Sequence, residues 1–173
     1  SKKTFWHYHP EVELVYVNGG CGKRQIGSHI SYYRNGDLIL IGSLLPHCAF
    51  TDGLTNHNRE TVIQFRNDFL GNDFLNTPEM SRIQDLLEKA KKGIVFHSDT
   101  KRRIGAIIES LRELNPFQKL LGLLEVLNSL EKTGDYTILN AEGFLLETNL
   151  QDNDRINIIF NYVKEHFQRP ISL

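Results

Sequence analysis

Three polar side chains near the start of the chain share one parity: His7, His9 and Glu13. In an extended backbone alternate residues point to the same face, so these three side chains would lie together. Two imidazoles and a carboxylate are costly to bury without partners, because each loses its hydration. His47, much later in the chain, is the fourth candidate for the same site.

Three histidines and one carboxylate can bind a divalent transition metal and leave coordination positions open. The same residues can instead form a polar pocket that binds a small ligand by hydrogen bonds. In a third interpretation they pair with one another and have a structural role alone. Trp6 adjoins His7 and has an indole N–H that needs an acceptor, so it is a further candidate for ligand contact. No set of residues indicates a catalytic centre.

The spacing of these residues resembles the two motifs of the cupin family. In the first motif, three residues separate His9 from Glu13 and six separate Glu13 from Gly20. The second motif is matched only in part, by Gly36, Gly42, Pro46 and His47. A full second motif would have Pro, Gly and Asn at Gly42, Leu44 and Thr51. The resemblance implies a double-stranded β-helix of the jelly-roll type.

The first part of the chain has the pattern of short strands. Five runs rich in Val, Ile, Tyr and Phe are separated by turn-forming Gly, Asn and Asp. The spaces between them are too short for the helical crossovers of a parallel sheet, so the pattern predicts an antiparallel sandwich or barrel. Together with the cupin resemblance, this makes an antiparallel β-barrel the predicted fold. The predicted strands are Val12–Val17, Gln25–Arg34, Asp37–Ile41, Cys48–Thr51 and Thr61–Arg66.

Residues 78–168 have the period of helices, which makes the whole an α+β arrangement. Thr77-Pro78 and Asn115-Pro116 mark two helix starts. The helix that begins at Pro116 has an apolar face wider than one packing partner needs, so we predict that it also mediates a homodimer. The residues predicted for dimerisation are Leu120, Leu123, Leu124, Leu127 and Leu130.

Composition limits the function classes. The chain has 173 residues and a formal net charge of −1, which argues against a surface built to bind DNA phosphates. The two cysteines are too few for a disulfide framework and favour a reducing compartment, so we expect a cytoplasmic protein. No apolar run approaches the length of about 18 residues that a membrane span requires.

Several stretches resemble the N-terminal sensor domain of bacterial AraC-type transcription regulators. In the β half these are His7–Val17, Gly36–Gly42 and Leu45–His47, and Asn67–Leu75 continues the likeness. The last stretch, Asp154–Phe167 followed by Ile171–Leu173, resembles the opening helix of the DNA-binding domain of these regulators. The resemblance covers nearly the whole chain, and the order of the stretches makes it more specific than any one of them.

The resemblance implies three parts: an effector-binding barrel (1–76), a helical dimerisation and linker segment (77–150), and the first helix of a truncated helix-turn-helix domain (151–173). The helix-turn-helix motifs would follow Leu173, so the parent protein would bind DNA only through that missing domain. The expected effector is a sugar or a similar small polar molecule. Two alternatives stay open: a carbohydrate-binding module, or a metal-dependent cupin enzyme of isomerase or dioxygenase type with His7, His9, Glu13 and His47 as ligands.

Overall fold

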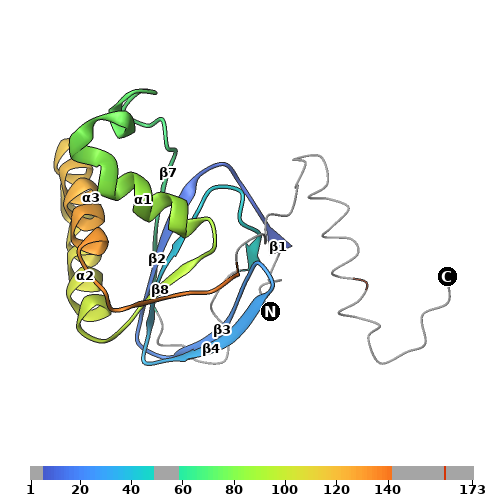
Figure 1. The fold of residues 1–173 in the computed structure, drawn as a ribbon. Helices are drawn as coiled ribbons and strands as arrows, with labels where there is room; N and C mark the ends of the chain where they lie inside the picture. Colours follow the sequence, from blue (N-terminus) through green and yellow to red (C-terminus); the bar gives the residue numbers. More distant parts are fainter. Residues whose placement is uncertain (1–5, 49–58, 142–161, 163–173) are drawn as a thin grey trace.

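The computed structural model describes residues 6–48 and 59–141 together with Tyr162. These residues form three layers: a group of helices, a five-stranded sheet and a four-stranded sheet (Figure 1). Every strand pairing is antiparallel. The predicted α+β fold with antiparallel strands is therefore confirmed. The described strands form two separate sheets, however, and no described strand pairs with members of both, so they do not make the closed barrel that was predicted.

The five-stranded sheet lies in the middle, in the order β7-β2-β5-β8-β9. Its strands are β2 (Val12–Asn18), β5 (Asp37–Ile41), β7 (Arg59–Phe65), β8 (Ile94–Phe96) and β9 (Tyr136–Ile138). The second sheet has the order β1-β6-β3-β4. Its strands are β1 (Trp6–His7), β3 (Cys21–Ile26), β4 (His29–Arg34) and β6 (His47–Cys48).

Two features of the sheets differ from the sequence-based expectation. The run Gln25–Arg34 is a hairpin and not one strand, because Gly27 has a φ of +56° and turns the chain between β3 and β4. In addition, β8 and β9 come from the half of the chain with the helical period, where no strand was predicted. All three residues of β8 are buried, so this strand has no alternation of polar and apolar residues that could have indicated it.

Three helices cover one face of the five-stranded sheet (Figure 1). Two 3-10 turns, η1 (Phe74–Asn76) and η2 (Pro78–Met80), lead into α1 (Ser81–Ala90). Helix α2 (Ser98–Ser110) continues into the 3-10 turn η3 (Leu111–Glu113), and α3 (Pro116–Glu131) follows. The Asn115 side chain caps α3, because it accepts a hydrogen bond from the Gln118 backbone N–H. In return, the Gln118 side chain accepts a hydrogen bond from the Asn115 backbone N–H. Among the described helices, none has the length and apolarity that crossing a membrane requires.

The side chains of β2 alternate between two cores, which fixes where polar groups can meet. Val12 and Leu14 pack with the helices in the larger core. Val15 and Val17 pack in a second cluster with Ile26 of the other sheet. Glu13 shares the parity of Val15 and Val17, so it lies on the side of β2 that faces the four-stranded sheet.

Helix α3 differs from the prediction in which residues it leaves available. Leu123, Leu127 and Leu130 are buried in the core of the same chain, 7%, 0% and 0% exposed. Helices α1 and α2 of the same chain pack against α3, so these three leucines offer little surface to a second chain. Of the five residues predicted for dimerisation, Leu120 and Leu124 are half-buried. Dimerisation itself stays a prediction.

The predicted C-terminal helix, from about Asp154 to Gln168, lies outside the described residues except for Tyr162, which is helical.

Candidate functional site

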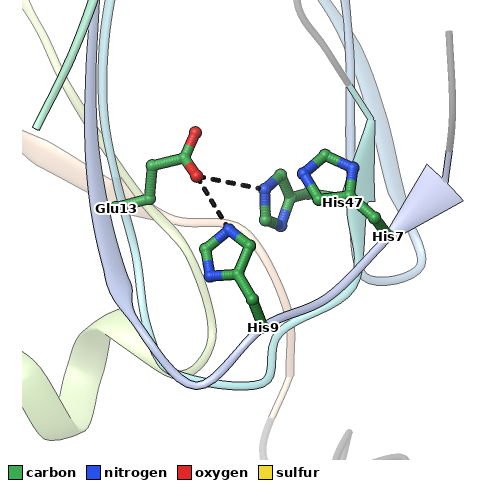
Figure 2. Close-up of side chains that lie close together, drawn as sticks. All are labelled: His7, His9, Glu13 and His47. Carbon is green, nitrogen blue, oxygen red and sulfur yellow. Dashed lines mark hydrogen bonds and ion pairs between the residues drawn. The ribbon is translucent and has the colours of Figure 1, made fainter. Parts of the chain in front are cut away.

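The side chains of His7, His9, Glu13 and His47 come together (Figure 2). Each offers one potential ligand atom, and these four atoms lie within 4.8 Å of one another. His7 on β1 and His47 on β6 are direct cross-strand neighbours in the four-stranded sheet. Glu13 comes from β2 of the five-stranded sheet, and His9 lies in the segment that joins β1 to β2. The predicted convergence of these four side chains, here called the donor cluster, is confirmed; its ligand stays a prediction.

Glu13 is the centre of the contacts within the donor cluster. Its Oε2 atom lies 2.9 Å from His9 Nε2 and 3.6 Å from His47 Nε2 (Figure 2). The same oxygen accepts a hydrogen bond of 2.9 Å from the side-chain amide of Gln64. Glu13 and His47 are only 7% and 1% exposed, whereas His7 and His9 are half-buried. The carboxylate therefore lies at the buried end of the cluster, with three polar groups around one oxygen.

Backbone carbonyl groups fix the orientation of two imidazole rings. Nδ1 of His9 donates to the Glu11 carbonyl at 3.1 Å, and Nδ1 of His47 donates to the Leu45 carbonyl at 2.8 Å. A carbonyl can only accept, so Nδ1 carries the proton in both rings. Nε2 of each ring consequently faces Glu13. Metal-binding histidines in proteins usually have this arrangement, in which the other ring nitrogen donates to a carbonyl or a carboxylate.

The pKa values of the cluster describe its metal-free state. Burial alone would raise the pKa of Glu13, but its contacts with His47, His9 and Gln64 outweigh burial and hold this pKa well below the ordinary value of 4.5. The pKa of His9 is raised above 6.5, chiefly by its hydrogen bond to Glu13. Both nitrogens of His9 face acceptors, so an imidazolium ion beside a carboxylate accounts for the metal-free cluster.

The loop before His47 is attached to the segment that carries His9. The Leu44 backbone N–H donates to the His9 carbonyl at 2.9 Å, and Ser43 Oγ donates to the Pro10 carbonyl at 2.7 Å. These bonds hold two donor-bearing segments at a fixed distance from each other, although they are far apart in sequence.

The donor set fits a divalent transition metal. Imidazole nitrogens and carboxylate oxygens bind zinc at about 2.0–2.2 Å, which separates neighbouring donors by roughly 3–4 Å. The four donor atoms all lie within 4.8 Å of one another, and Glu13 Oε2 is 2.9 Å from His9 and 3.6 Å from His47, so small side-chain rotations would suffice. Two imidazoles already have fixed tautomers, and the carboxylate already has a hydrogen-bond donor in Gln64.

Trp6 and Gln64 differ from what the sequence indicated. Trp6 pairs with Cys48 and is buried, and the alternation along β1 places it on the opposite face from His7. Its contact with a ligand stays a prediction. Gln64 was not identified from the sequence, although it contacts Glu13 directly. It lies opposite Glu13 in the pairing of β7 with β2, and because β7 contains several other polar residues, only this strand pairing identifies it.

Comparison with known proteins gives little further information. No protein-family model matches the chain, and no curated protein matches it. Among solved structures, it is similar to ToxT from Vibrio cholerae O395, bound to (E)-4-(8-methylnaphthalen-1-yl)but-3-enoic acid. The two share 14% identity and a TM-score of 0.43, over 98% of this chain and 62% of ToxT. The chain thus spans less than two thirds of ToxT. A likeness at this level assigns neither a family nor a ligand to the chain.

Proposed function

We propose that this chain is the ligand-sensing domain of a bacterial AraC-type transcription regulator. In this proposal the donor cluster binds a divalent transition metal, and a small polar effector such as a sugar binds beside it. The observation that carries the proposal is the convergence of three imidazoles and one carboxylate from two different sheets. The regulator assignment rests on the sequence resemblance of the β half, the helical segment and the C-terminal stretch.

The local chemistry supports a metal more than a purely structural role for the cluster. Glu13 and His47 are almost fully buried, and burying charged groups is costly unless strong partners compensate. Carbonyl groups orient the His9 and His47 rings so that their Nε2 atoms point to one place. A bound metal would supply a Lewis-acidic centre with open positions for the oxygen atoms of an effector. Gln64, beside Glu13, is then in a position to donate to that effector.

The arrangement of the sheets supports a cupin-like double-stranded β-helix. Residues of the first motif (His7, His9 and Glu13) and of the second motif (His47) come from three strands and the segment between β1 and β2, and they meet at one place. Two antiparallel sheets with a shared apolar layer are the expected core of such a fold. We further propose a homodimer in the cytoplasm, with DNA bound by a domain that follows the sensor in the complete protein.

Metal binding is the first test. Metal-free protein is titrated with Zn²⁺, Ni²⁺ and Mn²⁺ by calorimetry and by thermal unfolding. We expect one ion per chain, and at a free metal concentration 100 times Kd a gain of about 2.7 kcal/mol in unfolding free energy. The variant Glu13→Gln should lose most of this gain. The control His29→Gln, a histidine outside the cluster, should keep it. Absence of binding for all three ions would refute the metal centre.

The regulatory role needs the complete gene product. A mobility-shift assay with the DNA upstream of its own gene, with and without a panel of sugars, should reveal DNA binding that an effector changes. The change should disappear in the complete protein carrying Glu13→Gln. If the metal-loaded chain instead turns over one of these sugars, or oxidises a substrate with O₂, the enzyme alternative replaces the sensor. DNA binding that no ligand or metal alters would also contradict the sensor assignment.

A further inference from the structure

Asn140 is a buried polar residue just after β9, only 6% exposed. Its Nδ2 donates to two backbone carbonyls, those of Ile26 at 3.1 Å and of Lys92 at 2.9 Å. Its Oδ1 accepts from the backbone N–H of Ser28 at 3.0 Å and from Ser28 Oγ at 3.2 Å. One side chain thus makes four hydrogen bonds and joins three segments: the β3–β4 turn, the loop after α1, and the end of β9.

The turn that Asn140 holds is also the support of His47. Ile26, the last residue of β3, is the register partner of His47. The next residue, Gly27, donates its N–H to the Pro46 carbonyl at 2.7 Å. Strand β6 has only two residues, and its other neighbour is the equally short β1, where His7 faces His47. The backbone position of His47 therefore depends on the turn Ile26–Ser28 more than it would in a long strand.

Asn140 is also held through its backbone by the loop after α1. Its own backbone N–H donates to the Lys92 carbonyl at 3.0 Å, and the Leu139 N–H donates to the Gly93 carbonyl at 2.9 Å. The sequence beyond it leads to Asp154–Phe167, the stretch that resembles the opening helix of a DNA-binding domain. Asn140 consequently holds the end of β9 both to the support of the donor cluster and to the loop after α1.

We propose that Asn140 is a positioning residue that couples metal binding at the donor cluster to the end of β9. The inference rests on the proposed metal centre. Removing the side-chain amide would take its hydrogen bond from the buried Ile26 carbonyl and would leave the Lys92 carbonyl with the backbone N–H of residue 140, so the turn at Ile26 would shift to regain a partner. The ligands of a metal site tolerate displacements of only about 0.5 Å. Because Ile26 in this turn pairs with His47, a shift of the turn displaces His47 and weakens metal binding. Because coupling is reciprocal, metal binding must in turn hold the Asn140 bonds more tightly.

Zinc affinity of variants tests the first half of this coupling. Asn140→Asp keeps an acceptor for Ser28 but loses the two hydrogen bonds that Nδ2 donates. Asn140→Ala loses all four hydrogen bonds of the side chain. Outer-shell partners of metal sites change metal affinity by about 10–100-fold, and we expect the lower end, about tenfold, because Asn140 acts through the backbone. The matched control is Thr100→Val, which removes another buried side-chain hydrogen bond, to Thr133 Oγ1 at 2.9 Å, among the helices. This control should lose stability while its zinc affinity stays unchanged.

Amide hydrogen exchange of the wild-type chain tests the second half and needs no variant. Zinc should slow exchange at the N–H groups of Leu139 and Asn140 by about the same factor by which zinc affinity falls in Asn140→Ala. Zinc binding without added protection there, or Asn140 variants with wild-type zinc affinity, would overturn the coupling and leave the metal centre standing. A wild-type chain that does not bind zinc, nickel or manganese would refute the metal centre and the coupling together.

Discussion

Gly42 is the first residue of the loop that leads from β5 to His47. The structure leaves no space at Gly42 for a side chain. A Cβ atom added to Gly42 would lie 2.5 Å from the Lys91 nitrogen, 2.6 Å from the Ala90 carbonyl carbon and 2.7 Å from the Lys91 Cα. All three are backbone atoms, so no flexible side chain can move aside. The Gly42 N–H also donates to the Ala90 carbonyl at 2.7 Å, a bond that a shifted loop would lose.

These contacts give the expected size of the effect of Gly42→Ala. Overpacking costs about 1–3 kcal/mol, and the lost hydrogen bond adds about 1 kcal/mol. We therefore expect the free energy of unfolding to fall by about 3 kcal/mol. At about 2–4 °C per kcal/mol for a domain of this size, the midpoint of thermal unfolding should fall by about 6–12 °C. Zinc affinity should fall as well, because the displaced loop carries His47.

The matched control is Gly134→Ala. A Cβ at Gly134 would have no atom within 4 Å, and its φ is not in the left-handed region. This variant should unfold within about 0.5 kcal/mol of the wild type, as surface substitutions usually do. The reasoning is refuted if Gly42→Ala and Gly134→Ala unfold at the same temperature in calorimetry, because the tight contact at Gly42 would then have no energetic consequence.

Three further results are expected. Asp37→Asn removes the carboxylate that pairs with Arg24 between the two sheets, where both side chains are largely buried. The free energy of unfolding in urea should therefore fall by about 3–5 kcal/mol, and an unchanged urea midpoint would contradict this. In the metal-free chain, the raised pKa of His9 stabilises the fold below pH 6.5, and this stability is lost as the pH rises through the pKa that His9 has in the folded chain. The lowered pKa of Glu13 stabilises the fold above pH 4.5, and this stability is lost as the pH falls through the pKa that Glu13 has in the folded chain. Their combined contribution should thus peak between these values, and urea midpoints from pH 4 to 9 that keep rising to pH 9 would refute it. Phe117, 67% exposed on α3, is a better probe of dimerisation than the buried leucines, and Phe117→Glu should shift sedimentation toward the monomer without unfolding the chain.

The elements that could be predicted are those with a strong local signal. Asn115 as N-cap and the proline after it place the start of α3 correctly. The strands β2 and β5 are rich in β-branched and aliphatic residues and lie between turn residues, and their bounds agree with the prediction to within one residue. These signals depend on neighbours in sequence, so no knowledge of the tertiary structure is needed to read them.

The elements that could not be predicted depend on tertiary contacts. Strand β9 has half-buried and exposed residues and is short, and only its pairing with β8 makes it a strand. Leu123 and Leu130 were predicted to be at an interface because their stripe exceeds what one partner needs, but two helices of the same chain, α1 and α2, pack on α3. The width of an apolar face gives the number of its partners and does not tell whether they belong to the same chain.

The donor cluster was predicted correctly, but the alternation argument is only part of the reason. That argument assumed one extended strand from His7 to Glu13, whereas His7 belongs to β1, Glu13 to β2 of the other sheet, and the chain between them is irregular. Alternation cannot be counted across such a segment, because each new strand restarts it. What brings His7 and Glu13 together is that the two sheets share an apolar layer, and that both side chains are directed to it. His47 is far from Glu13 in sequence, and the chain must return to the same layer to bring the two side chains to 3.6 Å. A motif that includes both residues therefore reflects the fold and not only the local strand. The resemblance to the two motifs is therefore stronger evidence for a common site than the parity of the first three residues.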